Sequence, residues 1–228
     1  MNSDKGELTM RNLVFGNNFM GLPLSLTHKG DEGFCPEILD AIRRNMDMAL
    51  MKHSQVLVVL FTVSYPSNCN ENQRDNIILP GVELPSDNTV FSYFLNQYIR
   101  RLNSEKYDVR YLWCREQTAG SAHCHYHLVL WLNRNEIQYF GSMEQVNGYW
   151  SQALANHGIV APGADTAGLI DRGRYEQDGK TQYYGMTVHR GNPQEYEAVF
   201  QRASYLAKAY SKNAPCPPRT RLWGCSER

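Results

Sequence analysis

The chain has 228 residues, of which 42% are hydrophobic and 11% aromatic, and its 23 Lys and Arg residues balance its 23 Asp and Glu residues. This composition supports a full hydrophobic core and excludes an intrinsically disordered protein. The zero net charge excludes a broadly basic surface, so any nucleic-acid contact must come from local clusters of cations.

The cysteine pattern and the hydropathy indicate a cytoplasmic protein. The six cysteines form no CxxC pair, and Cys114 and Cys124 fall inside predicted strands, as free buried thiols do. No apolar run reaches the length of a membrane span, and the polar start of the sequence has no signal-peptide core behind it. We therefore expect a cytoplasmic location and no disulfide framework.

In the first half of the chain, an extension precedes two predicted helices and a strand. Residues 1–34 are rich in Gly and Asn and weakly patterned, which is typical of an extension or a poorly ordered arm. Apolar positions three and four apart predict amphipathic helices at 36–50 and 89–102. Between them, the continuous apolar run at 56–63 predicts a central strand, followed by a long polar loop.

The second half of the chain predicts a hairpin and then a mixture of helices and strands. The hairpin strands span 107–116 and 123–132, joined by the Gly-containing loop 117–122. The later elements are a helix at 136–157, a Gly-rich excursion at 158–179, a strand at 183–189 and a last helix at 193–212. Because helices and strands do not alternate regularly, we expect an α+β domain at 35–228, with a central antiparallel sheet flanked by helices.

Three histidines, His123, His125 and His127, stand at alternate positions of the second hairpin strand. Side chains two apart share one face of a strand, so the imidazoles point to one side and the apolar residues between them to the other. If the loop 117–122 closes evenly, Glu116 lies opposite His123 and one diagonal step from His125. This pattern predicts a metal site of imidazoles and a carboxylate; the alternative is exposed histidines on an edge strand.

Helical spacing separates two stripes on the last predicted helix. One stripe is apolar and predicts burial: Val199, Ala203, Leu206 and Tyr210. The other places a tyrosine among cations: Arg202, Tyr205, Lys208 and Lys212. Cations three residues before and after Tyr205 favour a phenolate and can hold a phosphate beside it, so Tyr205 is the expected nucleophile and Tyr210 a core residue. The alternative is a helix whose cations are merely solvated.

Three motifs in order resemble those of rolling-circle replication initiators of the HUH superfamily. Residues 61–66 (FTVSYP) resemble the family's first motif, residues 125–127 (HYH) its metal motif, and residues 205–208 (YLAK) its catalytic Tyr-x-x-Lys motif. Together with the tail at 219–226, they look closest to the inovirus-type and YagK/YfjJ-like prophage replication proteins. The resemblance covers roughly residues 36–228.

The resemblance implies a HUH endonuclease with an RRM-like fold, encoded by a phage or prophage and acting in the bacterial cytoplasm. Such an enzyme uses a divalent ion, Mg²⁺ or Mn²⁺, to polarise the scissile phosphate of single-stranded DNA at an origin hairpin or nick site. A tyrosine attacks, leaving a 5′-phosphotyrosine and a free 3′-hydroxyl; host replication proteins are further expected partners. The implied roles are catalysis by Tyr205 and Lys208, metal binding by His125, His127 and Glu116, and DNA binding by Arg202, Lys212 and Tyr65.

Two departures from the family pattern leave alternatives. Relatives with two catalytic tyrosines carry the second one four positions after the first, where this chain has Ala209, and the nearby Tyr210 is shifted; this favours a single-tyrosine enzyme. The extra His123 also permits His123 and His125 as the metal pair, although the apolar run after His127 favours His125 and His127. The alternative functions are a catalytically inactive DNA-binding or regulatory relative and an unrelated metal-dependent hydrolase.

Overall fold

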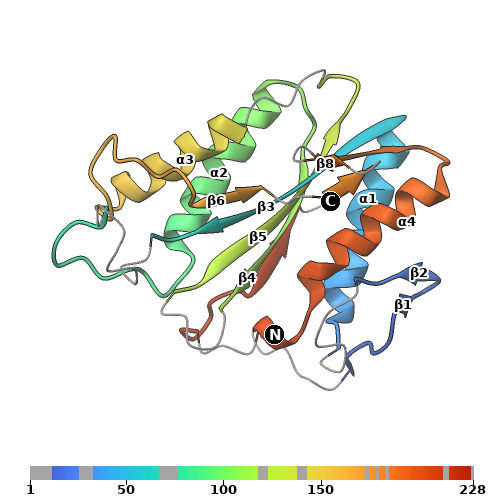
Figure 1. The fold of residues 1–228 in the computed structure, drawn as a ribbon, viewed down its shortest axis with the longest axis horizontal. Helices are drawn as coiled ribbons and strands as arrows, with labels where there is room; N and C mark the ends of the chain where they lie inside the picture. The colour runs from blue at the N-terminus through green and yellow to red at the C-terminus, as the bar shows by residue number, and fades with distance from the viewer. Residues whose placement is uncertain are drawn as a thin grey trace, which may run out of the picture.

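The computed structural model of the chain shows a central antiparallel sheet covered by helices on both faces (Figure 1). It describes residues 12–25, 33–66, 77–117, 123–137, 143–172, 175–177, 180–182, 185–212 and 216–226. The helices are α1 (Pro36–Lys52), α2 (Thr89–Ser104), α3 (Met143–Asn156) and α4 (Pro193–Ala203), with 3-10 turns η3 (Ser204–Ala207) and η4 (Tyr210–Lys212). None of the helices in these ranges is long and apolar enough to span a membrane.

Within the described ranges, the central sheet has six strands in the order β10-β4-β5-β3-β6, with β9 also paired to β3. Its strands are β3 (Gln55–Ser64), β4 (Arg110–Glu116), β5 (His125–Asn133), β6 (Ile170–Arg172), β9 (Met186–His189) and β10 (Trp223–Cys225). All pairings between them are antiparallel. The structure thus confirms the predicted α+β class, the central antiparallel sheet and the pairing of the two hairpin strands beside β3.

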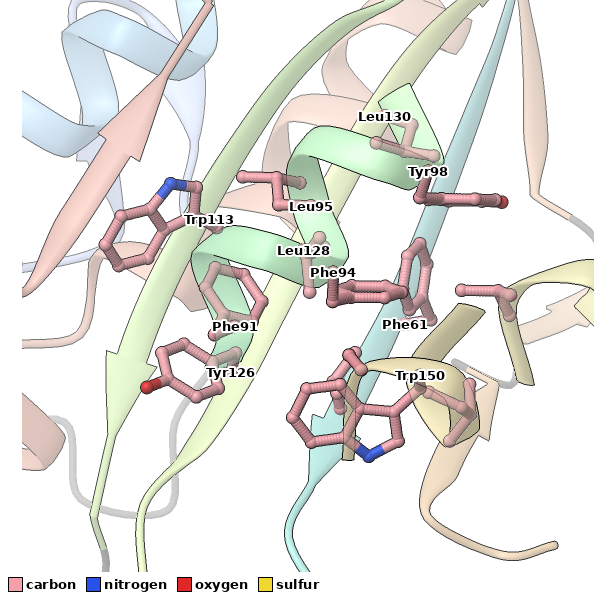
Figure 2. Packing of buried hydrophobic residues seen from close by; sticks show 14 of the residues in the cluster. Phe61, Phe91, Phe94, Leu95, Tyr98, Trp113, Tyr126, Leu128, Leu130 and Trp150 are labelled. Atoms are coloured by element: carbon pink, nitrogen blue, oxygen red, sulfur yellow. The ribbon is translucent and has the colours of Figure 1, made fainter. Parts of the chain in front are cut away.

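The alternation of side chains gives each face of the sheet its own hydrophobic core. Figure 1 shows α2 and α3 on one side of the sheet and α1 and α4 on the other. On the α2 side, the ring of Phe91 stacks on Tyr126 with centroids 3.8 Å apart and meets the edge of Trp113 (Figure 2). On the α1 side, the core includes Val129 and Trp131. Alternate residues of a strand point to the same face of the sheet, so His125 and His127 lie with Val129 and Trp131 on the face covered by α1 and α4.

Part of the predicted N-terminal extension packs on this second face. Residues 12–25 contain the short hairpin β1 (Asn18–Phe19) and β2 (Leu22–Pro23). Phe19 lies in a stacked orientation against Phe200 of α4, and Leu24 is 1% exposed. This segment therefore contributes to the α1 and α4 core, while 1–11 and 26–32 lie outside the described residues.

Several predicted elements have different bounds in the structure. The helix predicted at 136–157 corresponds to α3 (Met143–Asn156); residues 134–136 form a turn instead, and residues 138–142 lie outside the described residues. The strand predicted at 183–189 contains β9. The Gly-rich excursion at 158–179 contains β6 and β7 (Tyr175–Gln177), and β7 pairs antiparallel with β8 (Lys180–Gln182), which follows the excursion. The five cysteines within the described ranges are free, and Cys114 and Cys124 are buried as predicted.

The helix predicted at 193–212 ends at Ala203, which corrects the continuous helix expected from the periodicity. Beyond η3, the chain becomes extended at Lys208 and pairs with Phe34. The N–H of Cys35 donates to the carbonyl of Ala207 at 2.7 Å, and the N–H of Ala209 donates to the carbonyl of Gly33 at 3.1 Å. These long-range hydrogen bonds replace the helical ones, so the residues after 203 no longer follow helical stripes.

Replacing Phe91 by Ala is expected to lower the free energy of unfolding by about 4 kcal/mol, because Phe91 is fully buried between Tyr126 and Trp113. Urea unfolding followed by circular dichroism measures this loss. Met51→Ala is the control: Met51 is 80% exposed on α1, so its replacement should change the value by less than about 0.5 kcal/mol. Equal effects of the two substitutions would contradict the packing shown in Figure 2.

Candidate active site

The register of β4 and β5 places Glu116 directly opposite His125. This corrects the expected pairing of Glu116 with His123 by two residues: the connection spans residues 117–124, and His123 precedes the strand. A shift of two residues leaves Glu116 on the same face of the sheet as the histidines, and it places Glu116 one diagonal step from His127.

Glu116, His125 and His127 form a compact group of potential metal ligands. Each offers one ligand atom, and these atoms lie within 4.8 Å of one another. Oε2 of Glu116 lies 3.2 Å from Nε2 of His127 and 3.9 Å from Nε2 of His125. The carboxylate is buried while both imidazoles are partly exposed, so the group opens toward the histidines. His123, the alternative ligand, is not part of this group.

The protonation states of the group suit a divalent cation. Burial acts to raise the pKa of Glu116, but a hydrogen bond from His127 and the charge of Lys212 lower this pKa to about 2. Burial lowers the pKa of His125, and His127 lowers it further. A charged carboxylate and a neutral imidazole are the forms that bind metal. Two nitrogens and one oxygen on one face of the sheet would leave coordination positions open on a bound ion, as a Lewis-acid site requires.

Two further side chains hold these ligands in place. Thr62 Oγ1 lies 2.9 Å from Nδ1 of His127, on the side of the ring away from Glu116. A hydrogen bond at this nitrogen orients the ring and leaves Nε2 available to an ion. Nζ of Lys212 donates to Oε1 of Glu116 at 3.0 Å and to the carbonyl of Lys208 at 2.9 Å. Because Lys212 engages Oε1, Oε2 remains directed toward the histidines.

Tyr205 lies at the protein surface, next to the group of potential metal ligands. Its side chain is 36% exposed, and its ring centroid lies 5.6 Å from that of His127. Nζ of Lys208 lies over the Tyr205 ring, 3.2 Å from the centroid. Burial lowers the pKa of Lys208 to about 8; Glu116 opposes this shift and Lys212 adds to it. The structure therefore brings the tyrosine and lysine of the Tyr-x-x-Lys motif to the candidate metal ligands.

The electrostatic argument for a Tyr205 phenolate is contradicted by the structure. Burial raises the pKa of Tyr205, and Tyr210 and Glu116 raise it further. Lys208 contacts the face of the ring, so its charge attracts the π electrons of Tyr205. The neutral phenol is therefore the favoured form of Tyr205 in this structure.

Burial corrects two of the predicted DNA-binding residues. Tyr65 is 4% exposed and packs against Trp150 and Tyr126, so it cannot stack on an unpaired base. The Lys212 side chain is 0% exposed and serves as the counter-ion of Glu116. Arg202, the third predicted residue, is partly exposed and lines a cavity beside Tyr205. Tyr210, expected in the core, is partly buried.

Sequence reasoning missed the roles of Thr62 and Lys212. A signal for Thr62 was present, because Thr62 and Ser64 interrupt an apolar strand at alternate positions and so mark a polar patch on one face. No local signal marked Lys212 as buried, since a lysine on a predicted helix normally faces water.

Mn²⁺ is expected to stabilise the protein by about 2.7 kcal/mol at a concentration about 100 times its Kd, because the ligands exist as a group only in the folded chain. Thermal unfolding with and without Mn²⁺ measures the effect. His125→Ala and His127→Ala should each abolish the stabilisation, whereas His123→Ala should retain it. Loss of the effect in His123→Ala with retention in His127→Ala would reverse the assignment of ligands.

Lys212→Met is expected to destabilise the protein by about 3–5 kcal/mol, because it leaves the Glu116 carboxylate buried without its cation. Urea unfolding in the presence of a chelator measures this loss without a metal contribution. The double variant Glu116→Gln/Lys212→Met should recover at least half of it. Lys52→Met, at an exposed lysine, is the control. A double variant as unstable as the single one would assign the loss to packing.

Comparisons with known proteins identify the family of this chain. The N-terminal nuclease domain of non-structural protein 1 from minute virus of mice is a similar solved structure: it is 13% identical, with 67% of this chain and 80% of that chain covered and a TM-score of 0.37. Among curated proteins, none matches. The family model of the YagK/YfjJ C-terminal domain matches residues 19–226. The chain therefore belongs to the YagK/YfjJ C-terminal domain family.

Proposed function

We propose that this protein is a replication initiator that nicks single-stranded DNA at an origin and rejoins it through a 5′-phosphotyrosine, as in rolling-circle replication. The proposal is supported above all by the contact of the Tyr205 ring with His127, which joins a candidate nucleophile to candidate metal ligands. These residues come from a hairpin and a segment some 80 residues later, so their contact is a product of the fold and not of sequence proximity. The motif order supports the same function.

The proposed reaction exchanges one phosphodiester for another. A divalent ion, Mg²⁺ or Mn²⁺, held by Glu116, His125 and His127 would withdraw electron density from the scissile phosphate. The phenolic oxygen of Tyr205 forms a bond to phosphorus as the bond from phosphorus to the 3′ oxygen breaks. The phenol releases its proton to water, and the departing 3′ oxygen gains a proton from water. Because the number of ester bonds is unchanged, attack by a 3′-hydroxyl on the phosphotyrosine rejoins the strand.

Lys208 is placed to stabilise negative charge during this exchange. Its ammonium lies against Tyr205, and phosphate binding brings further negative charge to the same place. A fixed cation beside an oxygen and a phosphorus that gain charge lowers the barrier more than water does. Lys212 is buried and pairs with the Glu116 carboxylate, so the charge of Lys212 is directed to this ligand and that of Lys208 to the substrate.

The proposed setting is a bacterial cytoplasm, with the protein encoded by a phage or prophage and host replication proteins as partners. The requirement for Tyr205 distinguishes the proposed function from two alternative functions. A DNA-binding relative without activity needs neither the metal nor the tyrosine, and a metal-dependent hydrolase needs the metal but no tyrosine nucleophile. A covalent adduct between protein and DNA is formed by a nicking initiator and by neither alternative.

Tyr205→Phe is expected to abolish the covalent adduct while leaving single-strand and metal binding within about twofold, because only one hydroxyl is removed. Wild type and variant are incubated with single-stranded oligonucleotides and Mn²⁺, and the adduct is detected on a denaturing gel.

Tyr210→Phe is the matched control and should still form the adduct, with a stability loss of at most about 1 kcal/mol. His127→Ala should lose the adduct together with metal binding. An adduct formed by Tyr205→Phe but not by Tyr210→Phe would show that Tyr210 is the nucleophile.

A further inference from the structure

A cavity of about 380 Å³ opens beside the candidate nucleophile. It lies between the sheet and the end of α4, and it shares His127 and Tyr205 with the candidate active site. The apolar residues Leu60 and Leu206 line part of it. A cavity of this size that is partly lined by apolar residues can hold a group as large as a nucleobase.

The carboxylate residue Asp171 lines this cavity and is not one of the potential metal ligands. Asp171 of β6 pairs with Thr62 of β3, which in turn pairs with His127 of β5. Directly opposed residues in antiparallel strands share a face, so these three residues form a row across the sheet. Asp171 lies two strand spacings, roughly 10 Å, from His127 along this row. That separation is comparable with the reach from a backbone phosphate to the far edge of its own base.

The polar groups of the cavity match the parts of a nucleotide. Arg202 of α4 lines the cavity together with Asp171, so both a cation and an anion border the same space. A cation suits the phosphate backbone, whereas a carboxylate repels it and suits N–H donors. The two charges therefore favour one orientation, with the phosphate near Tyr205 and the base near Asp171.

We propose that this cavity binds the base of the nucleotide adjoining the scissile phosphate and that Asp171 reads the Watson–Crick edge of that base. The inference rests on the proposed nicking function, because a phosphate held at Tyr205 must place a neighbouring base in adjoining space. A carboxylate only accepts hydrogen bonds. Guanine offers it two adjacent donors, N1–H and the 2-amino group, whereas thymine offers one N–H between two carbonyl oxygens that the carboxylate repels. The structure thus favours guanine over thymine.

The test compares wild type with Asp171→Asn on two probes. In the first, each protein and Mn²⁺ react with a pool of random single-stranded oligonucleotides, and the DNA in covalent adducts is sequenced. Wild type should favour guanine over thymine by about tenfold at one position beside the cut. Asp171→Asn should reduce this ratio to about twofold or less, because an amide both donates and accepts. Glu197→Gln, at an exposed acid elsewhere on α4, should behave as wild type.

The second probe needs no chemistry and separates the two proposals. Calorimetry with Mn²⁺ should show that wild type binds dGMP about tenfold more tightly than dTMP, and that Asp171→Asn loses most of this difference. A guanine preference in binding without any adduct would reject nicking and support the base site. Adducts whose base preference is the same in Asp171→Asn would support nicking and overturn the role of Asp171. Equal affinity of wild type for dGMP and dTMP would overturn it as well.

Discussion

The candidate site depends on one constraint: a carboxylate is buried in it and must remain charged. Glu116 is 4% exposed, and an ionised carboxylate at such a position costs several kcal/mol unless cations and hydrogen bonds compensate. Lys212 on one oxygen and His127 on the other provide that compensation. An ion bound between Glu116 and the histidines would add to it, so folding and metal binding are linked through the same group.

The hydrophobic cores determine how accurately the ligands are placed. Tyr126, which separates His125 from His127, is fully buried and stacked on Phe91 of α2, so β5 cannot rotate without breaking that core. The histidines are thereby held on the opposite face, where the carboxylate of β4 meets them. Side chains that project from paired strands are positioned more firmly than side chains on loops, so the candidate ligands are held in a defined geometry.

Local sequence patterns predicted the helices, the strands and the faces of their side chains. Strand register and burial depend on long-range contacts, which local patterns do not contain. The 3.6-residue period gave α1 and α2, and the two-residue period placed His125 and His127 on one face, because both periods are properties of the local chain. The pairing of Glu116 was displaced by two residues because the register is a property of the whole β4–β5 pair, which the local pattern of residues 117–122 does not contain. The burial of Tyr65 was missed because its motif records residue order and not packing.

The early end of α4 shows why the active-site details escaped prediction. In a continuous helix, Tyr205, Lys208 and Lys212 would lie along one solvent-facing stripe, each about one turn from the next. Pairing of residues 33–35 with 207–209 ends the helix instead, a contact across about 170 residues that no local pattern contains. After the break, Lys208 lies over the Tyr205 ring and Lys212 reaches Glu116. This short segment thus places Tyr205 beside the candidate metal ligands, the Lys208 cation over its ring and the Lys212 cation on Glu116. The positions of Tyr205, Lys208 and Lys212 relative to the candidate metal ligands therefore all follow from the early end of α4.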